Sequence, residues 1–460
     1  MNRFELTSLK KGAHIHFIGI GGISMSGIAH ILLDEGFVIS GSDRCESAIT
    51  DELKCLGARI YIGHSAENVH GSDLVVHTAA VHDDNPEMQE AKKLGICLID
   101  RAECLGAIMK GYTHRIGISG THGKTTTTGM LAHALVAAEL DPTISIGGEL
   151  DLIGGNIRVG ARDYFVTESC EYTNSFLKFY PTVSVITNVE EDHLDFFKDI
   201  NDIKSSFRKF AELALPDGYV IVCADNKNAL DSVSGLAGGI ITYGIKGGDY
   251  TAENIRHIEK TTIFDCKTPN GTIKDVTLNV VGDHNIQNAL AVIAVCSVVG
   301  ADIKKALEGI KSYTGTHRRF EKKGTCRGAE VIDDYAHHPT EIKATLSAAK
   351  NICKGRIRCI FQPHTYSRTR TLWSDFLTAF DNADELILTD IYAARELPDG
   401  VTTSKALAEA ISQRKKNVRY IKEFSDIADY IKQTASPTDM IFTMGAGTVT
   451  EIGPMIVDEK

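Results

Sequence analysis

The sequence predicts an α/β protein of three domains, each built around a mainly parallel sheet. Its 460 residues are about three times the length of a typical domain of roughly 150 residues. Apolar runs of strand length alternate with helical patterns along the chain, which is typical of parallel sheets covered by helices. Glycine-rich turns follow several of these runs. We expect domain boundaries that divide the chain into residues 1–108, 109–312 and 313–460.

The composition is that of an ordinary globular protein, with 43% apolar and 24% charged residues. A net charge of −11 argues against non-specific binding to nucleic acid, which needs a basic surface. The 11 cysteines show no C-x-x-C spacing, which indicates reduced thiols and argues against a structural zinc site. The chain shows neither a signal peptide nor an apolar stretch of membrane-spanning length. We therefore expect a cytoplasmic protein that is not inserted in a membrane.

The first domain is expected to open with a strand over residues 14–20, which runs into Gly21 and Gly22. Ser24 is expected to cap the following helix, and Gly36 stands where a C′ glycine would end it. A diphosphate would fit at the N-terminus of such a helix.

Further strands are predicted over residues 37–40 and 74–77, with Asp43 and Thr78 just past their ends. Asp43 would then lie near a ribose. The pattern is similar to the dinucleotide fingerprint, except that Ser24 stands in place of its third glycine. From the residues alone, the ligand is either a dinucleotide or another nucleotide diphosphate.

The second domain opens with a strand over residues 115–119 and the run GTHGKT, followed by a helix rich in threonine, leucine and alanine. Glycines let backbone N–H groups turn toward phosphate oxygens, and the helix adds its positive end. Lys124 is expected to reach the β- and γ-phosphates and Thr125 to bind Mg²⁺. Gly117 lies one residue earlier than the usual G-x-x-x-x-G-K-[ST] pattern requires. The nucleotide contacts predicted in this phosphate loop are Gly120, Thr121, His122, Gly123, Lys124, Thr125 and Thr126.

Two further strand ends of this domain carry groups that bind metals. Glu168 ends one predicted strand, and TNVEEDHLD (187–195), which contains His193, follows the next. Ligands of open α/β sheets bind at the carboxyl ends of strands, and Mg²⁺ prefers oxygen ligands there. A solvated, capped loop explains the EEDH run equally well on the residues alone.

The remaining sequence predicts a short antiparallel region, a helix and a third sheet. Alternating runs over residues 240–280, with TPNG at a hairpin turn, precede a helix over 285–299. That helix begins in GDHNIQNA, whose Asn amides suit the edge of an adenine, although helix capping also explains them. The third domain is expected to contain the strands VIDDY, RCIFQP, ELILTD and MIFTMGAG.

These motifs resemble those of the ATP-dependent Mur ligases, which build the peptide of the bacterial cell wall. GTHGKTT is similar to the family's G-T-x-G-K-[ST], TNVEEDHLD to T-N-x-x-x-D-H-x-D, and GDHNIQNA to G-x-H-N-x-x-N-A. GIGGISMSG in the first domain and HRRFE (317–321) match as well. DDYAHHP and QPHTYSRTR resemble the branch that adds the first amino acid to the UDP-sugar. The resemblance implies an N-terminal Rossmann-like domain, a central P-loop ATPase-like domain and a C-terminal Rossmann-like domain.

The resemblance also implies a role for each matching residue. ATP and Mg²⁺, at two metal sites, are the implied cofactors. The metal ligands would be Thr125, Glu168 and His193. The adenine and the remaining ATP contacts would involve His284, Asn285, Asn288, Arg319 and Asp334. The UDP-sugar would be bound by Gly21, Gly22, Ser24, Asp43, His64 and Thr78, and the reacting groups by Tyr335, His337 and Arg368. The catalytic residues would be Lys124, His193, His337 and Arg368.

The expected reaction passes the γ-phosphoryl group of ATP to the lactyl carboxylate of UDP-N-acetylmuramate and then joins L-alanine to the acyl phosphate. Three alternatives stay open. A ligase that recycles a whole tripeptide onto the same UDP-sugar is nearest, although its motifs differ from ISMSG and QPHTYSR. A nicotinamide-dependent oxidoreductase leaves GTHGKT unexplained. A P-loop ATPase that acts on a partner would turn over ATP without the UDP-sugar.

Overall fold

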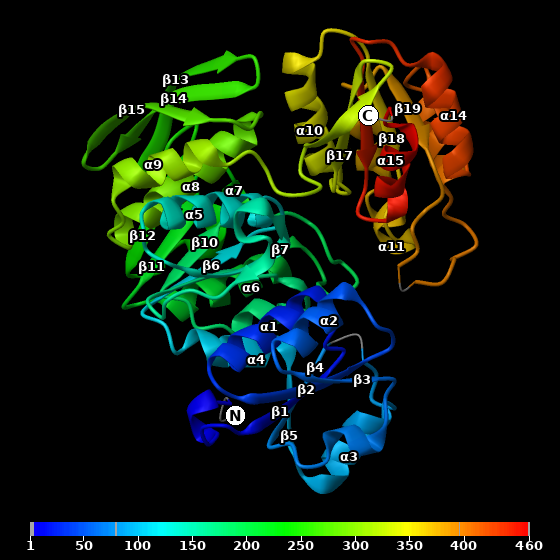
Figure 1. Ribbon diagram of the computed structural model, residues 1–460. Helices are drawn as coiled ribbons and strands as arrows, with labels where there is room; N and C mark the ends of the chain where they lie inside the picture. Colours follow the sequence, from blue (N-terminus) through cyan, green and yellow to red (C-terminus); the bar gives the residue numbers. More distant parts are fainter. Residues whose placement is uncertain (1–3, 79–80, 395, 459–460) are drawn as a thin grey trace.

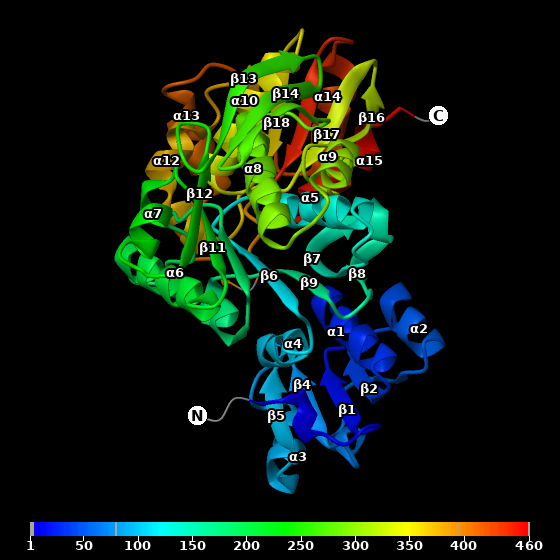
Figure 2. The ribbon, with the colours of Figure 1, turned by 90° about the vertical axis from the view of Figure 1, so that its left-hand side faces the viewer.

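The computed structural model describes residues 4–78, 81–394 and 396–458, and in it the chain forms three α/β domains, each with its own sheet. The N-terminal domain lies at one end of the molecule, and the central and C-terminal domains lie together at the other (Figures 1 and 2). The predicted three-domain α/β fold is therefore confirmed. Among the described residues, no helix has both the length and the apolar character needed to cross a bilayer.

The N-terminal domain contains a five-stranded sheet in the order β3-β2-β1-β4-β5, with all pairs parallel. This is the Rossmann order, in which the chain changes direction between β1 and β4 and leaves a crevice at the carboxyl ends of these strands. Its strands are β1 (His14–Ile18), β2 (Val38–Asp43), β3 (Arg59–Ile62), β4 (Leu74–His77) and β5 (Cys97–Asp100). Its helices are α1 (Ile23–Asp34), α2 (Ala48–Cys55), α3 (Pro86–Leu94) and α4 (Arg101–Met109).

The ends of α1 confirm one prediction and correct another. Gly36, with a φ of 85°, follows the last turn as a C′ glycine should. Ser24 does not cap the helix, because the N-cap residue is Gly22, whose backbone is extended. Ser24 instead lies within the first turn, where its Oγ accepts a hydrogen bond of 2.9 Å from Nη1 of Arg101.

The central domain contains a ten-stranded sheet in the order β15-β14-β13-β12-β11-β10-β6-β9-β7-β8. Its strands are β6 (His114–Ser119), β7 (Thr143–Leu150), β8 (Gly155–Arg158), β9 (Tyr164–Glu168), β10 (Val183–Ile186), β11 (Tyr219–Cys223), β12 (Gly239–Gly244), β13 (Tyr250–Ile258), β14 (Thr261–Thr268) and β15 (Gly271–Leu278). Its helices are α5 (Lys124–Ala137), α6 (Ile200–Ala214), α7 (Lys227–Val233), α8 (Asp283–Val298) and α9 (Ile303–Ser312).

The predicted antiparallel region is confirmed from β13 to β15, and the TPNG turn joins β14 to β15, with Thr268 paired with Gly271. Its first strand is different, because β12 runs parallel to both β11 and β13. The loops after β6, β9 and β10 leave the same edge of the sheet, since these three neighbouring strands are parallel. This edge therefore holds the phosphate loop and both segments of the predicted metal site.

The C-terminal domain has a six-stranded sheet in the order β16-β17-β21-β18-β19-β20, parallel except for β16. Its strands are β16 (Glu321–Cys326), β17 (Ala329–Asp334), β18 (Ile357–Phe361), β19 (Glu385–Leu388), β20 (Val418–Tyr420) and β21 (Met440–Met444). Its helices are α10 (Pro339–Ile352), α11 (Tyr366–Thr371), α12 (Trp373–Ala379), α13 (Ser404–Ser412), α14 (Phe424–Thr434) and α15 (Ile452–Ile456).

The hydrophobic cores show that the three domains are joined in different ways. One buried cluster contains Ile15 and Phe17 of the N-terminal domain together with Phe176, Phe207 and Phe210 of the central domain. The two clusters of the C-terminal domain contain only its own buried residues. Apolar burial therefore holds the first two domains together, whereas among the described residues the third shares no buried apolar cluster with them.

Candidate active site

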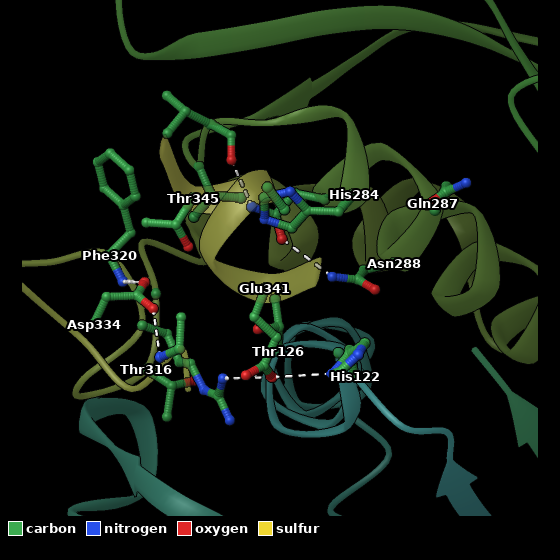
Figure 3. Close-up of a pocket in the computed structure, with 18 of the residues that line it drawn as sticks. His122, Thr126, His284, Gln287, Asn288, Thr316, Phe320, Asp334, Glu341 and Thr345 are labelled. Carbon is green, nitrogen blue, oxygen red and sulfur yellow. Dashed lines mark hydrogen bonds and ion pairs between the residues drawn. The ribbon is translucent and has the colours of Figure 1, made fainter. Parts of the chain in front are cut away.

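A cavity of about 670 Å³ lies between the central and C-terminal domains. Its walls come from the phosphate loop, the start of α8, the connection after α9 and the start of α10 (Figure 3). The structure thus brings predicted nucleotide contacts from distant parts of the sequence to one cavity. Those that line it are His122, Gly123, Thr126, His284, Asn285, Asn288, Arg319 and Asp334.

The phosphate loop connects β6 to α5, and two of its glycines are required by its shape. Gly120 has a φ of 143°, and a Cβ there would lie 1.9 Å from Oγ1 of Thr187. Gly123, with a φ of 83°, is the N-cap residue of α5. Positive φ values and this close packing exclude most side chains, so the backbone can turn its N–H groups toward an anion at the helix N-terminus.

Lys124, the first residue of α5, points back into this loop. Its Nζ donates hydrogen bonds to the carbonyl oxygens of Gly120 and Thr121, and lies 3.0 Å from Oε2 of Glu171. Burial by itself lowers the pKa of Lys124, but the carboxylate of Glu171 outweighs it and holds the pKa above its usual range. The lysine is therefore fully charged at neutral pH, as a phosphate-binding group must be.

Two of the three predicted metal ligands lie against the same short segment of β7. A Cβ on Gly147 would lie 3.0 Å from Oε2 of Glu168, and a Cβ on Gly148 would lie 3.1 Å from Cγ2 of Thr125. Oε1 of Glu168 accepts a hydrogen bond of 2.7 Å from the backbone N–H of Gly147. A hydroxyl and a carboxylate beside the phosphate loop form an oxygen donor set that fits Mg²⁺.

His193, the third predicted ligand, has different neighbours. Its φ is 54°, its ring lies over the ring of Tyr172 with centroids 4.5 Å apart, and its Nε2 is 3.8 Å from Oδ2 of Asp192. It lines a second cavity, of about 430 Å³, together with His364, Thr365 and Arg368.

Arg368, on α11, is held in this second cavity by Asp192 from the central domain. Its Nη2 lies 3.0 Å from Oδ1 of Asp192, and its Nη1 lies 3.0 Å from Nδ1 of His364. Although burial opposes ionisation of Asp192, the charge of Arg368 keeps the pKa of this carboxyl well below its usual range. The second cavity is thus bordered by a charged guanidinium, which suits a carboxylate of an incoming amino acid.

His337, which is neutral, contacts one lining residue of each cavity, Glu341 and His364. Burial lowers the pKa of His337 to about 3. Nδ1 lies 3.0 Å from the carbonyl oxygen of Tyr335 and 3.5 Å from Oε2 of Glu341. Since both neighbours are acceptors, Nδ1 carries the proton and Nε2 keeps its lone pair.

The side-chain amides at the start of α8 form hydrogen bonds with other side chains of the protein. Nδ2 of Asn288 donates to Oδ1 of Asn285 at 3.1 Å, and Oδ1 of Asn288 accepts from Oγ1 of Thr127 at 3.1 Å. The first bond lies within α8, and the second ties α8 to α5. Burial lowers the pKa of the neighbouring His284 to about 4, so this side chain enters the cavity as a neutral ring.

The predicted UDP-sugar residues gather around the crevice of the N-terminal domain. Oδ2 of Asp43 accepts a hydrogen bond of 2.8 Å from the backbone N–H of Gly21. A Cβ on Gly19 would lie 2.9 Å from Cγ2 of Thr78, which places Thr78 beside the same turn. His64 lies at the end of β3, and its Nδ1 is 2.9 Å from Oε2 of Glu87.

Models of three Mur ligase domains match this chain in succession. The Mur ligase family catalytic domain matches residues 14–113, the middle domain 118–296, and the glutamate ligase domain 318–447. The UDP-N-acetylmuramate–L-alanine ligase of Caldanaerobacter subterraneus subsp. tengcongensis is 53% identical over 454 residues, which cover 98% of this chain and 99% of that protein. The protein of the same name from Acetivibrio thermocellus is 50% identical over 463 residues, covering 100% and 99%. The chain belongs to the Mur ligase family.

Solved structures of Mur ligases agree with this assignment. The UDP-N-acetylmuramate-alanine ligase MurC of Thermotoga maritima has a TM-score of 0.80 at 30% identity and covers 96% of this chain and 98% of its own. The murein peptide ligase Mpl of Psychrobacter arcticus has a TM-score of 0.69 at 25% identity, with coverages of 97% and 98%. Mur ligases are ATP-dependent enzymes, and the lysine-containing phosphate loop of this chain lies at the edge of a cavity.

Sequence reasoning missed three carboxylates that hold predicted site residues. Glu87 is fully buried and contacts His64, Asp192 binds Arg368, and Glu341 contacts several groups at the start of α10. Glu341 had a local signal, because a glutamate at N3 of a helix is typical of a capping box. Glu87 had none, since its partner lies 23 residues away. Asp192 stands in the TNVEEDHLD motif, but its partner Arg368 lies 176 residues away, so the motif did not indicate the contact.

Proposed function

We propose that this chain is an ATP-dependent ligase that joins L-alanine to the lactyl carboxylate of UDP-N-acetylmuramate, a step in the synthesis of peptidoglycan precursors. The near full-length identity of 53% to a relative that carries this name is the observation on which the proposal rests. The geometry supports it, because the phosphate loop, a nucleotide-sized cavity and an arginine-lined second cavity meet between two domains.

In this reaction the γ-phosphoryl group of ATP passes to the lactyl carboxylate, the amine of L-alanine attacks the acyl phosphate, and phosphate leaves. Phosphoryl transfer requires alignment and charge neutralisation more than covalent chemistry. Lys124 would bind the β- and γ-phosphates, and Arg319, which lines the cavity, would add a second positive charge. Mg²⁺, held by Thr125 and Glu168, would supply further neutralisation of the phosphate charge; a second ion at His193 completes the proposed metal set.

Arg368 would bind the carboxylate of L-alanine in the second cavity. His337 would orient the attacking amine, because its Nε2 offers a lone pair toward the reacting groups. A histidine whose pKa is about 3 holds a proton poorly at neutral pH, which favours orientation of the amine over its deprotonation. Tyr335 and Asp334 would support this segment, since Oδ1 of Asp334 accepts a hydrogen bond of 2.8 Å from the N–H of Ala336.

The test is phosphate release from ATP and Mg²⁺ with UDP-N-acetylmuramate, measured against a panel of L-alanine, other amino acids and the tripeptide, with the product mass confirmed. We expect release that requires both the UDP-sugar and L-alanine. Release that proceeds without the UDP-sugar would support the ATPase alternative. A product with the tripeptide alone would support the recycling ligase.

A further inference from the structure

The first turn of α10 is docked against two loops of the central domain by polar contacts. Oγ1 of Thr340 donates to Oε2 of Glu190 at 2.7 Å, and Nε2 of His338 lies 3.2 Å from the carbonyl oxygen of Glu191. Nδ1 of His122, in the phosphate loop, lies 3.2 Å from Oε1 of Glu341. These contacts connect the two domains at the place where no apolar core is shared.

His122 is fixed to the phosphate loop and reaches across this interface. Its backbone N–H donates to Oδ1 of Asn188 at 2.8 Å, and its carbonyl oxygen accepts from Oγ1 of Thr187 at 2.6 Å. Its two ring nitrogens face two carboxylates, with Nε2 lying 3.3 Å from Oε2 of Glu190. Only the doubly protonated imidazolium can donate to both. The position of this side chain is therefore set by the loop that would hold the phosphates.

The two carboxylate oxygens of Glu341 contact different groups, in the phosphate loop and in the C-terminal domain. Oε1 faces His122 and lies 3.7 Å from Nη1 of Arg319. Oε2 accepts from the backbone N–H of His337 at 3.1 Å and of His338 at 3.3 Å. Figure 3 shows Glu341 and His122 on the wall of the cavity, joined by a dashed line. One carboxylate, whose side chain is only 11% exposed, thus contacts the phosphate loop and both residues proposed to act on ATP and on the amine.

We propose that His122 and Glu341 form a latch between the phosphate loop and the C-terminal domain, and that Glu341 is the positioning residue for Arg319 and His337. The phosphate loop presents His122, and the docked carboxylate sets the geometry of the amino-acid side. The inference rests on the proposed function, because the positioned groups are those assigned to ATP and L-alanine.

A metal ion is the competing occupant of this interface, since His122, Glu190 and His338 offer atoms that all lie within 4.8 Å of one another. The hydrogen bonds favour the latch. Nδ1 of His338 accepts from the backbone N–H of Thr340 at 3.3 Å, so its Nε2 carries the hydrogen and donates it to Glu191. A ring nitrogen that carries hydrogen has no lone pair for a metal.

A double-mutant cycle on the full-length chain tests the latch. Glu341→Gln keeps an acceptor for the capping box while it removes the charge, and His122→Gln removes the imidazolium. Each variant should lower kcat/KM for L-alanine about tenfold, with KM for UDP-N-acetylmuramate unchanged because that site lies in another domain. The double variant should lose no more of kcat/KM than either single variant, which corresponds to a coupling free energy of about 1.4 kcal/mol.

A hundredfold, additive loss of kcat/KM in the double variant would overturn the proposal, as would equal changes in the KM of every substrate. Lys343→Gln, at an exposed position of the same helix, is the matched control.

X-ray scattering gives a readout that does not depend on turnover. With a non-hydrolysable ATP analogue and Mg²⁺, the protein and the Lys343→Gln control should become more compact, and Glu341→Gln should not. Equal compaction in all three proteins would contradict the latch. If the unmodified protein releases no phosphate with L-alanine, the proposed function fails, while the scattering comparison still decides the latch. Binding of Zn²⁺ alone that is lost in Glu190→Gln would instead establish the metal site and overturn the latch.

Discussion

Lys124 is the side chain on which phosphoryl transfer depends most directly. It is charged, almost buried and paired with Glu171 at 3.0 Å, so a bound phosphate would have to share or replace this partner. Lys124→Ala should lower kcat at least about a hundredfold, or about 2.7 kcal/mol of transition-state stabilisation, with little change in KM for UDP-N-acetylmuramate. Steady-state phosphate release measures both constants. A kcat close to that of the unmodified protein would refute the assignment, and Lys343→Ala serves as a control.

The imidazolium of His122 should make stability depend on pH. Burial opposes its charge, but Glu341 and Glu190 outweigh burial and raise the pKa of His122 from 6.5 to about 9. A raised pKa in the folded state gives stability that is complete below about pH 6.5 and is lost as the pH rises through about 9. The contribution is at most on the order of 3 kcal/mol.

Thermal unfolding of the protein and of His122→Gln across this range measures the effect. The two midpoints should differ most at pH 6 and converge above pH 9. A difference that stays constant with pH, or that grows as the pH rises, would contradict the charged state of His122. His338 faces the same ring, and burial lowers its pKa, which favours its neutral form.

At the residue scale, the sequence indicated candidate side chains for the site but not the partners that hold them in the structure. The motifs and the family resemblance named Lys124, His64 and Arg368 as candidate site residues. Their partners depend on which strand ends become neighbours in the folded sheet, and a single sequence does not contain that information. Glu171, the carboxylate that contacts Lys124, is an example.

At the scale of an element, the phosphate loop depends on the absence of a side chain at Gly120. A Cβ there would lie 1.9 Å from Oγ1 of Thr187, at a φ of 143° that other residues rarely adopt. Gly120→Ala should therefore displace the loop, raise KM for ATP at least about tenfold and lower the thermal midpoint. Gly247→Ala is a suitable control, because its φ is ordinary and a Cβ there meets nothing within 4 Å. An unchanged KM for ATP in Gly120→Ala would show that the loop does not need this geometry.

Elements with continuous apolar runs were predicted well, and exposed or short ones were not. The strands β4, β17, β18, β19 and β21 are almost entirely buried, so their sequences are recognisable. The edge strand β16 reads EKKGTC and pairs antiparallel with β17, and β20 has three residues. Neither has a run long or apolar enough to indicate a strand. The prediction that Ser24 caps α1 was wrong for a local reason as well. The glycine turn sets the start of α1, and no side chain caps it.

At the scale of the whole molecule, the cores indicate which domain moves. The N-terminal and central domains share a buried cluster, whereas polar contacts such as Arg368–Asp192 and His122–Glu341 dock the C-terminal domain. Polar interfaces of this kind permit relative motion of domains. We therefore expect ligands to move the C-terminal domain against a rigid pair formed by the other two.

Spin labels at exposed positions test this motion in a background without the exposed Cys45, Cys55 and Cys97. ATP analogue, Mg²⁺ and UDP-N-acetylmuramate together should change the distance between labels at Glu253 and Glu409, in the central and C-terminal domains. The distance between labels at Glu52 and Glu253 should stay the same. A change confined to the second pair would show that the N-terminal domain is the mobile one.

The central claim is that the nucleotide at the phosphate loop transfers its γ-phosphoryl group to the carboxylate of the sugar. UDP-N-acetylmuramate with ¹⁸O in both lactyl carboxylate oxygens, turned over with ATP and L-alanine, tests it most directly by mass analysis of the released phosphate. Transfer through an acyl phosphate predicts one ¹⁸O atom in each phosphate released. Phosphate without ¹⁸O, released while the amide product forms, would contradict the account.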